Sequence, residues 1–117
     1  MNQFVIRKVA TGVKFDLKAA NGETVATSEV YLSNAACRRG MESVRKSAAA
    51  AKLEDQTAQD RQETGNPKFQ LYQDKAGKFR FRLTARNGKV IAVSEAYATH
   101  AAALAGIESV RKNAAEE

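Results

Sequence analysis

Apolar and polar residues alternate along two stretches of the chain, residues 13–20 and 79–86. A period of two over this length is typical of a β-strand with one buried face. The apolar set is Val13, Phe15, Leu17 and Ala19 in the first stretch and Phe79, Phe81, Leu83 and Ala85 in the second. Shorter runs with apolar positions, 4–7 and 69–72, precede these stretches, and we expect each run to form a further strand.

Both alternating stretches end in the dipeptide Asn-Gly, at positions 21–22 and 87–88. Asn-Gly favours a two-residue type I′ turn, because both central residues of that turn need a positive φ. We therefore expect β-hairpins, with returning strands at 23–30 and 89–96. Each half of the chain then begins with a three-stranded antiparallel meander.

A two-residue loop would determine how the second and third strands pair. Counting outward from the first turn places Lys14 opposite Glu29. The same count places Arg80 opposite Glu95 in the second hairpin. Opposite charges at facing positions are an ordinary stabilising contact between strands, so we expect both carboxylates to be held in ion pairs.

The hydrophobic period changes to that of a helix after each third strand. Ser33 and Thr99 are suitable N-caps, and we expect helices at about 34–49 and 100–114. The apolar stripe is Cys37, Met41, Val44 and Ala48 in the first helix and Ala103, Ile107, Val110 and Ala114 in the second. Such stripes are typical of helices that pack on a sheet.

Two further features of the helices predict contacts. Gly40 and Gly106 lie in the apolar region, where each costs about 1 kcal/mol relative to alanine, so we expect close helix–sheet contact there. On the exposed side a glutamate precedes a lysine by four positions, which favours an ion pair within the helix. The predicted pairs are Glu42 with Lys46 and Glu108 with Lys112.

The two halves of the chain contain the same motifs in the same order. Asn-Gly, Ser-Glu-x-Tyr and Gly-x-Glu-Ser-Val-Arg-Lys each occur twice, sixty-six positions apart, and roughly half of the aligned residues are identical. Self-similarity at a fixed offset indicates one structural unit used twice, and units of this size usually cannot bury a core alone. We expect a single domain with residues 1–57 as the first repeat, 58–67 as a linker and 68–117 as the second repeat.

The predicted fold class is α+β. Two tandem β3-α repeats would form a two-layer structure, with an antiparallel sheet covered on one face by both helices and a pseudo-two-fold axis between the repeats. Because the repeats replace the two subunits of a dimer, we expect a monomer in solution. The segment between the repeats, 52–67, is polar and ends in Gly-Asn-Pro, so we expect part of it to be able to pair as a strand and most of it to be a mobile linker.

These motifs resemble those of the YegP-like family of small, mostly bacterial proteins of unknown function. The resemblance rests on Phe-x-Leu-x-Ala-x-Asn-Gly (15–22 and 81–88), Ser-Glu-x-Tyr and Gly-x-Glu-Ser-Val-Arg-Lys, and it covers nearly the whole chain apart from the linker. It implies β3-α units that occur singly, as a homodimer, or in tandem, with a short strand after the helix exchanged between units. Residues 52–57 match that strand in the first repeat, whereas the second repeat lacks it, so we expect an open sheet edge. The family implies no activity, cofactor or catalytic residue.

Composition limits the classes of function. The 117 residues carry a formal charge of +6, which attracts nucleic acid but is also common in small domains for solubility alone. Cys37 is the only cysteine, so an internal disulfide is excluded and a cytoplasmic location is favoured. No apolar run approaches the roughly 20 residues of a membrane span.

The Ser-Glu-x-Tyr element is a repeated motif of unknown role: Ser28, Glu29 and Tyr31, then Ser94, Glu95 and Tyr97. A carboxylate beside a hydroxyl could perform acid–base chemistry. The strand register instead favours an ion-paired glutamate, a serine bonded to a local carbonyl and a packed tyrosine whose phenol tip reaches water. A serine nucleophile also needs a base, and the single histidine, His100, occurs in only one repeat. We expect no catalytic residue, metal or cofactor; an enzyme would need a cleft that joins these residues from both repeats.

Three arginines of the second hairpin form the candidate binding surface. The alternation places Arg80, Arg82 and Arg86 on one face, near Tyr72, where they could hold single-stranded nucleic acid by phosphate contacts and base stacking. Acidic residues lie among these cations, so a solvated charged face is the competing interpretation. We expect a non-enzymatic protein that binds another macromolecule, with weak nucleic-acid binding through this face as the alternative.

Overall fold

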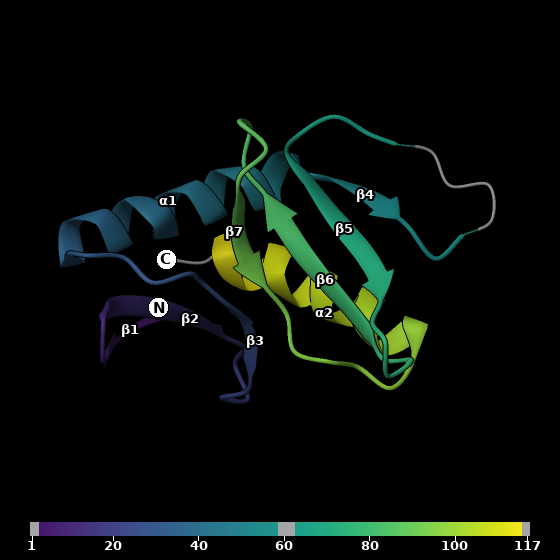
Figure 1. The fold of residues 1–117 in the computed structure, drawn as a ribbon, viewed down its shortest axis with the longest axis horizontal. Helices are drawn as coiled ribbons and strands as arrows, with labels where there is room; N and C mark the ends of the chain where they lie inside the picture. Colours follow the sequence, from purple (N-terminus) through teal and green to yellow (C-terminus); the bar gives the residue numbers. More distant parts are fainter. Residues whose placement is uncertain (1–2, 59–62, 116–117) are drawn as a thin grey trace.

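A computed structural model describes residues 3–58 and 63–115 as one sheet with two helices (Figure 1). The strands are β1 (Phe4–Val9), β2 (Gly12–Lys18), β3 (Thr24–Thr27), β4 (Lys52–Asp55), β5 (Lys68–Gln73), β6 (Phe79–Thr84) and β7 (Val90–Val93). The helices are α1 (Asn34–Ala50) and α2 (His100–Ala115). The predicted strands and helices are confirmed, although β3 and β7 are shorter than predicted.

The described strands form one sheet in the order β1-β2-β3-β7-β6-β5-β4. Its two halves meet where β3 and β7 run antiparallel and Thr27 pairs with Val93. β4 follows the first helix but joins the second half of the sheet, beside β5, as the family resemblance implies. This one pairing is parallel, so the prediction of a wholly antiparallel sheet is wrong. A hairpin-length connection would force antiparallel pairing, whereas the longer segment between β4 and β5 permits a parallel one.

Both helices cover the same face of the sheet and pack against each other (Figure 1). The core lies between these two layers, where alternate strand residues meet the apolar stripes of the helices. The largest fully buried side chains in it are Phe15, Leu17, Phe69, Leu71, Phe81, Leu83, Val44 and Val110. The fold is therefore α+β, and the opposite sheet face carries the polar residues of the alternating pattern.

The two Asn-Gly turns differ from the prediction. Gly22 and Gly88 have φ values of 88° and 86°, but no other residue type has a positive φ in the described part of the chain, so the type I′ prediction is wrong. The Ala19 amide donates to the Glu23 carbonyl at 2.8 Å, which makes a three-residue loop, and the second hairpin does the same. The Asn21 side chain accepts from the Glu23 amide at 3.0 Å, a contact that holds asparagine in an ordinary turn conformation. A bulge in each ladder absorbs the extra residue, so the strands beyond it keep the predicted register.

The predicted linker, 58–67, lies partly outside the described residues, at 59–62. Its described end is tied to the sheet by hydrogen bonds. The Thr64 amide donates to the Glu54 carboxylate at 3.0 Å, and the Asn66 side chain accepts from the Thr84 hydroxyl at 2.7 Å. The residues just before β5 therefore have a defined position, in contrast to the mobility expected from their composition.

Candidate functional site

The motif serines hold a bulge at the ends of β3 and β7. The Phe15 amide donates to Ser28 Oγ at 2.9 Å, and that hydroxyl donates to the Glu29 carbonyl at 2.7 Å. Ser94 makes the same two bonds at 2.9 and 2.8 Å. Strand pairing then resumes one residue out of register, at the motif tyrosines. The hydroxyl replaces a strand acceptor that the bulge displaces, so the prediction of a serine bonded to a local carbonyl is confirmed.

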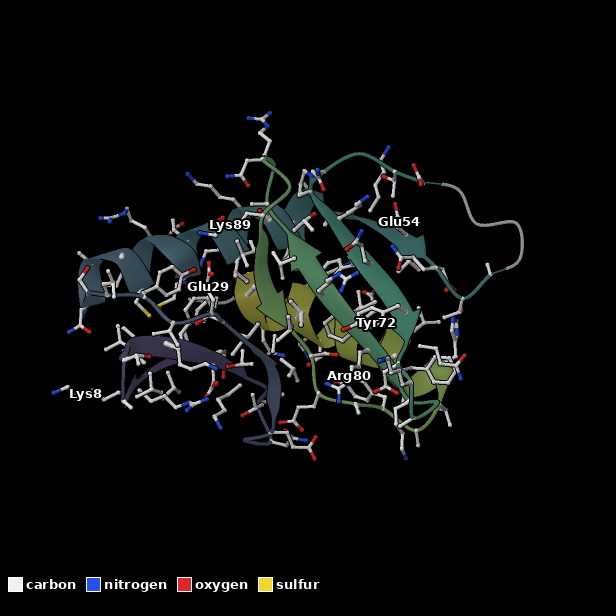
Figure 2. All side chains as sticks on the ribbon, viewed as in Figure 1. Lys8, Glu29, Glu54, Tyr72, Arg80 and Lys89 are labelled. Carbon is white, nitrogen blue, oxygen red and sulfur yellow. The ribbon has the colours of Figure 1, made fainter. Side chains whose placement is uncertain are left out.

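The motif glutamates do not have the predicted partners. Glu29 Oε2 lies 3.1 Å from Nζ of Lys89, which belongs to the other half of the sheet (Figure 2). The predicted partner was Lys14, on the adjacent strand. Glu95 has no ion pair with any residue that the structure describes. The bulge places two residues opposite one, and this turns the glutamates away from the neighbouring strand.

The motif tyrosines pack between sheet and helix. Tyr31 stacks on Phe15 with ring centroids 6.2 Å apart, and Tyr97 stacks on its equivalent phenylalanine at 6.1 Å. A Cβ atom at Gly40 or Gly106 would collide with the phenol end of the tyrosine below it. The helix glycines therefore allow the close contact that the sequence predicted. Burial raises the pKa of both phenols, as expected for packed rather than ionised side chains.

Two of the three candidate arginines lie on the sheet face opposite the helices. Arg82 Nε donates to Gln70 Oε1 at 2.7 Å, and its guanidinium lies over the Tyr72 ring, 4.5 Å from the centroid. Arg80 is next to Tyr72 across β5 and β6 (Figure 2) but pairs with Asp74 at 2.8 Å, not with the predicted Glu95. The Arg80 guanidinium lowers the Asp74 pKa. Arg82 is thus ordered by neutral partners, whereas the charge of Arg80 is already neutralised.

Arg86 does not share this face, which corrects the prediction of one three-arginine surface. The bulge near the end of β6 interrupts the alternation, and the hairpin turns Arg86 toward α1. There it lines a shallow pocket of about 390 Å³, the first junction pocket, whose polar lining is Ser43, Lys46, Ser47, Arg86 and Asn87. Periodicity alone could not reveal this break, because the predicted two-residue turn contains no bulge.

A buried carboxylate on β4 has the most strongly shifted pKa among the described residues, and sequence reasoning missed it. Glu54 (labelled in Figure 2) is 3% exposed. Its carboxylate pairs with Lys68 Nζ at 2.8 Å. The side-chain amides of Gln56 and Gln70 donate to its other oxygen at 2.7 and 3.2 Å. The bond from Lys68 is the main cause that lowers its pKa from 4.5 to about 2, against the cost of burial. Every partner compensates the buried charge, so the cluster fixes β4 beside β5, and loss of one partner would leave a buried charge unpaired.

The arginine of each helix motif caps the other helix. Arg111 Nη1 donates to the carbonyls of Ala48 and Ala51, at 3.0 and 2.8 Å, at the C-terminal end of α1. Arg45 Nε donates to the Ala114 carbonyl of α2 at 3.2 Å. Cations at the end of a helix satisfy its last carbonyls and interact favourably with its dipole. These two arginines therefore join the helices and are not part of a free basic surface.

The same two arginines also form ion pairs with the helix glutamates for which lysine partners were predicted. Glu42 pairs with Arg45 at 2.6 Å, and Glu108 lies 3.5 Å from Arg111, both at a spacing of three residues. The predicted i,i+4 pairs are wrong, because each arginine is held between the carbonyls of the other helix and its own glutamate. The lysine that follows each arginine has no ion pair with the described residues.

His100 and Cys37 have structural contacts. His100 Nε2 lies 2.7 Å from Asp55 Oδ2, so the start of α2 is linked to the end of β4. Thr57 binds the other oxygen of Asp55, which leaves that carboxylate fully occupied. Cys37 is buried in the core, and burial raises its thiol pKa, which disfavours the reactive thiolate.

Within residues 3–58 and 63–115, no three His, Cys, Asp or Glu side chains gather as metal ligands. Neither helix is long and apolar enough to cross a membrane.

The sequence matches a family described as a domain of unknown function, DUF1508, over residues 10–55 and 74–117. A UPF0339 protein of Treponema denticola is 68% identical over 47 residues, which are 40% of this chain and 81% of that protein, so the relative is about half as long. The UPF0339 protein PA0329 of Pseudomonas aeruginosa is 37% identical over 111 residues, covering 94% of this chain and 87% of the relative.

Solved structures agree with the fold. The solution NMR structure of yegP from E. coli, a protein of unknown function, superimposes with a TM-score of 0.76 at 29% identity, over all of this chain and 90% of the other. The UPF0339 protein SO3888 of Shewanella oneidensis gives the same TM-score at 30% identity, over 97% and 84% of the two chains.

Proposed function

Because the chain belongs to the DUF1508 family, whose relatives named above have no known function, its own geometry has to indicate its role, and we propose that it is a non-enzymatic cytoplasmic protein that binds another macromolecule. The observation that carries this proposal is the use of the repeated motif. Both serine hydroxyls are engaged with backbone groups, and Glu29 is in an ion pair. These three side chains are thus engaged in maintaining the sheet.

In this proposal the partner binds the sheet face opposite the helices. Five side chains on β5 and β6 lie on that face and are partly exposed: Lys68, Gln70, Tyr72, Arg80 and Arg82. A sheet surface with ordered polar side chains and no deep cavity among its described residues suits contact with an extended or broad partner better than enclosure of a small substrate.

One observation favours nucleic acid as the alternative partner. Arg82 is held over Tyr72 by a hydrogen bond to Gln70, so a planar cation and an aromatic ring are ordered side by side. Such a pair offers both a phosphate contact and a stacking surface. The charges of Arg80 and Asp74 cancel each other nearby. We therefore expect nucleic acid to bind weakly, with an affinity that depends only modestly on salt concentration.

We also propose that the chain is a monomer built as an internal pseudo-dimer, with the two tandem repeats related by a pseudo-two-fold axis. Support comes from the pairing of Thr27 with Val93, equivalent residues that face each other at the junction. The reciprocal contacts of Arg45 and Arg111 give further support. A solution mass near the 12.7 kDa of one chain is expected from sedimentation, and twice that mass would refute the proposal.

The macromolecular partner can be tested by capture from lysate on the immobilised full chain, with and without nuclease. We expect the R82A and Y72A variants to lose the captured partner and the R86A variant to keep it. Equal capture by all variants would exclude the sheet face. Titration of a labelled single-stranded oligonucleotide at two salt concentrations tests the alternative, and no binding at low salt would remove it.

A further inference from the structure

Two pockets of similar size lie where a helix of one repeat meets the hairpin of the other. The first junction pocket, of about 390 Å³, lies between the end of α1 and the β6–β7 hairpin. The second, of about 440 Å³, lies between α2 and the β2–β3 hairpin. Three of its polar lining residues, Ser109, Lys112 and Asn21, are equivalent to Ser43, Lys46 and Asn87 of the first. The two places therefore form an internal comparison, with the same architecture and different side chains.

The first junction pocket contains two cations and no carboxylate. Lys46 and Arg86 both line it, and neither has an ion pair or hydrogen bond with the described residues. The glutamate one turn before Lys46 is not available to it, because Glu42 is bound to Arg45 at 2.6 Å. The side chains of Ser43 and Asn87 add a hydroxyl and an amide that can donate. The polar lining is thus rich in donors and in positive charge.

The position of the pocket at the end of α1 would ordinarily oppose an anion. The last carbonyls of a helix carry partial negative charge, which repels anionic ligands. Here the Arg111 guanidinium covers the carbonyls of Ala48 and Ala51, at 3.0 and 2.8 Å. Although Glu108 lies 3.5 Å from Arg111, the guanidinium satisfies these carbonyls directly and offsets the dipole at the helix end. Lys46 and Arg86 are therefore the charges that line the pocket.

We infer that the first junction pocket binds a small organic phosphate. A phosphate group matches the donors, since arginine and lysine together can satisfy several of its oxygens through charge-assisted hydrogen bonds. The remaining walls are Ala50, Pro67 and Ala85, so an apolar substituent on the phosphate would contact carbon. The volume exceeds what the phosphate group alone needs, which favours a monoester over the free ion. This site is separate from the sheet face and does not depend on the proposed partner there.

The second junction pocket shows why the site is confined to one repeat. Ala20 stands at the position of Arg86, and Glu108 adds a carboxylate to the lining beside Lys112. One cation and one anion replace the two cations of the first pocket. We expect no phosphate binding there, although the backbone is arranged in the same way.

The test is an NMR titration of the full chain with phenyl phosphate, with inorganic phosphate and acetate in parallel. We expect saturable shifts of the Asn87 side-chain amide and of the Ser43 and Ser47 backbone amides, with phenyl phosphate the tightest ligand. R86A and K46A should each weaken binding by at least about tenfold, the loss expected for one charge-assisted contact. K112A, the equivalent change in the second pocket, should leave the affinity unchanged.

A gain-of-function variant tests the same inference from the other side. Combining A20R with E108Q places two cations and no carboxylate in the second pocket, and we expect a second phenyl phosphate to bind per chain. The inference is overturned if phenyl phosphate causes no saturable shifts, if R86A binds as tightly as the parent chain, or if acetate binds as tightly as phenyl phosphate. These outcomes are independent of the R82A capture experiment, so the failure of one proposal is distinguishable from the failure of the other.

Discussion

In the first repeat the motif glutamate Glu29 pairs with Lys89 across the junction, whereas its counterpart Glu95 borders a shallow pocket with Glu23 and Tyr97. Lys89 and Glu23 are equivalent positions of the two hairpins. Each motif glutamate thus lies near the residue just before the third strand of the other repeat. The two charges are opposite for Glu29 and Lys89, and alike for Glu95 and Glu23. Burial raises the Tyr97 pKa, and both carboxylates raise it further. The fold does not depend on an ion pair at this place.

The buried contacts of the shared motifs, in contrast, are the same in both repeats. Each serine bonds to a strand amide, each helix glycine accommodates a tyrosine, and each motif arginine caps the opposite helix. The repeats thus agree in the motif contacts that build the interior, and they differ at several exposed positions. Exposed differences, such as Arg86 against Ala20, are the places where the two halves can have distinct roles.

The largest expected effect concerns β4, which covers the edge of β5; no described strand covers the outer edge of β1. Glu54→Ala removes a buried charge and leaves Lys68 without its partner, and such losses cost about 3 kcal/mol or more. Urea denaturation should show a lower midpoint with an unchanged m-value. Lys75→Ala, on an exposed loop of the same half, is the control. A loss below about 0.5 kcal/mol would mean that the cluster contributes little.

The same carboxylate predicts a pH dependence. Its folded pKa of about 2 is below the unfolded value of 4.5, so its contribution is complete above pH 4.5 and is lost as the pH falls toward 2. The lowered pKa corresponds to about 3 kcal/mol at neutral pH. Glu54→Gln should flatten the fall in the free energy of unfolding over this range. If the free energy of unfolding of this variant fell as steeply below pH 4.5 as that of the parent chain, Glu54 would not be the group responsible.

The helix glycines should show a smaller effect. Gly40→Ala and Gly106→Ala each place a methyl group against a tyrosine, and overpacking of this kind costs about 1–3 kcal/mol despite the gain in helix propensity. Thermal denaturation of both variants measures the cost. In the Gly40→Ala background, Tyr31→Ala should remove most of the clash. If Gly40→Ala were stabilising, the close approach of α1 to Tyr31 would be wrong.

The next largest effect is expected from the arginines that cap the opposite helix. Arg111→Met keeps the aliphatic stem but removes the bonds to Ala48 and Ala51, and we expect a loss of about 1–2 kcal/mol. Hydrogen exchange should quicken in the last turn of α1, although the substitution is in α2. Lys112→Met, at the adjacent exposed position, provides the control. Faster exchange confined to α2 would argue against capping between the helices.

The smallest effect tests the charges at the junction. Glu23→Lys gives Glu95 the partner that Glu29 already has, and exposed pairs contribute about 0.5 kcal/mol. The gain should disappear at high salt. Lys89→Glu should produce a loss of similar size, because it repeats the like-charge arrangement on the other side. If the parent chain and both variants were equally stable, the charges at these two places would contribute nothing to stability.

Local patterns predicted most of the fold. Alternation identified β2 and β6, and the Asn-Gly turns placed the returning strands β3 and β7. Helical spacing identified α1 and α2, and the glycines correctly indicated close helix–sheet contact. The strand β4 was expected only from the family resemblance. Several errors arise where the backbone is irregular. Asn-Gly fits more than one turn type, and the bulge beside the turn directed Arg86 away from its expected face. A separate bulge at the motif serines turned the motif glutamates away from their expected partners.

The candidate site was less predictable than the fold. The contacts of Glu54 and Arg111 join residues far apart in the sequence, and no periodic signal marks them. The repeat itself gave one usable sign, because Arg45 and Arg111 recur in the same motif and proved to have equivalent roles. The first junction pocket joins a helix of one repeat to a hairpin of the other, so only the assembled structure reveals it.

The central claim is that the two halves complete one shared interior. Scanning calorimetry of the full chain tests this most directly. The account predicts a single transition whose calorimetric and van't Hoff enthalpies agree, because neither half retains a core once the other has unfolded. Two separable transitions, or a calorimetric enthalpy near twice the van't Hoff value, would contradict it.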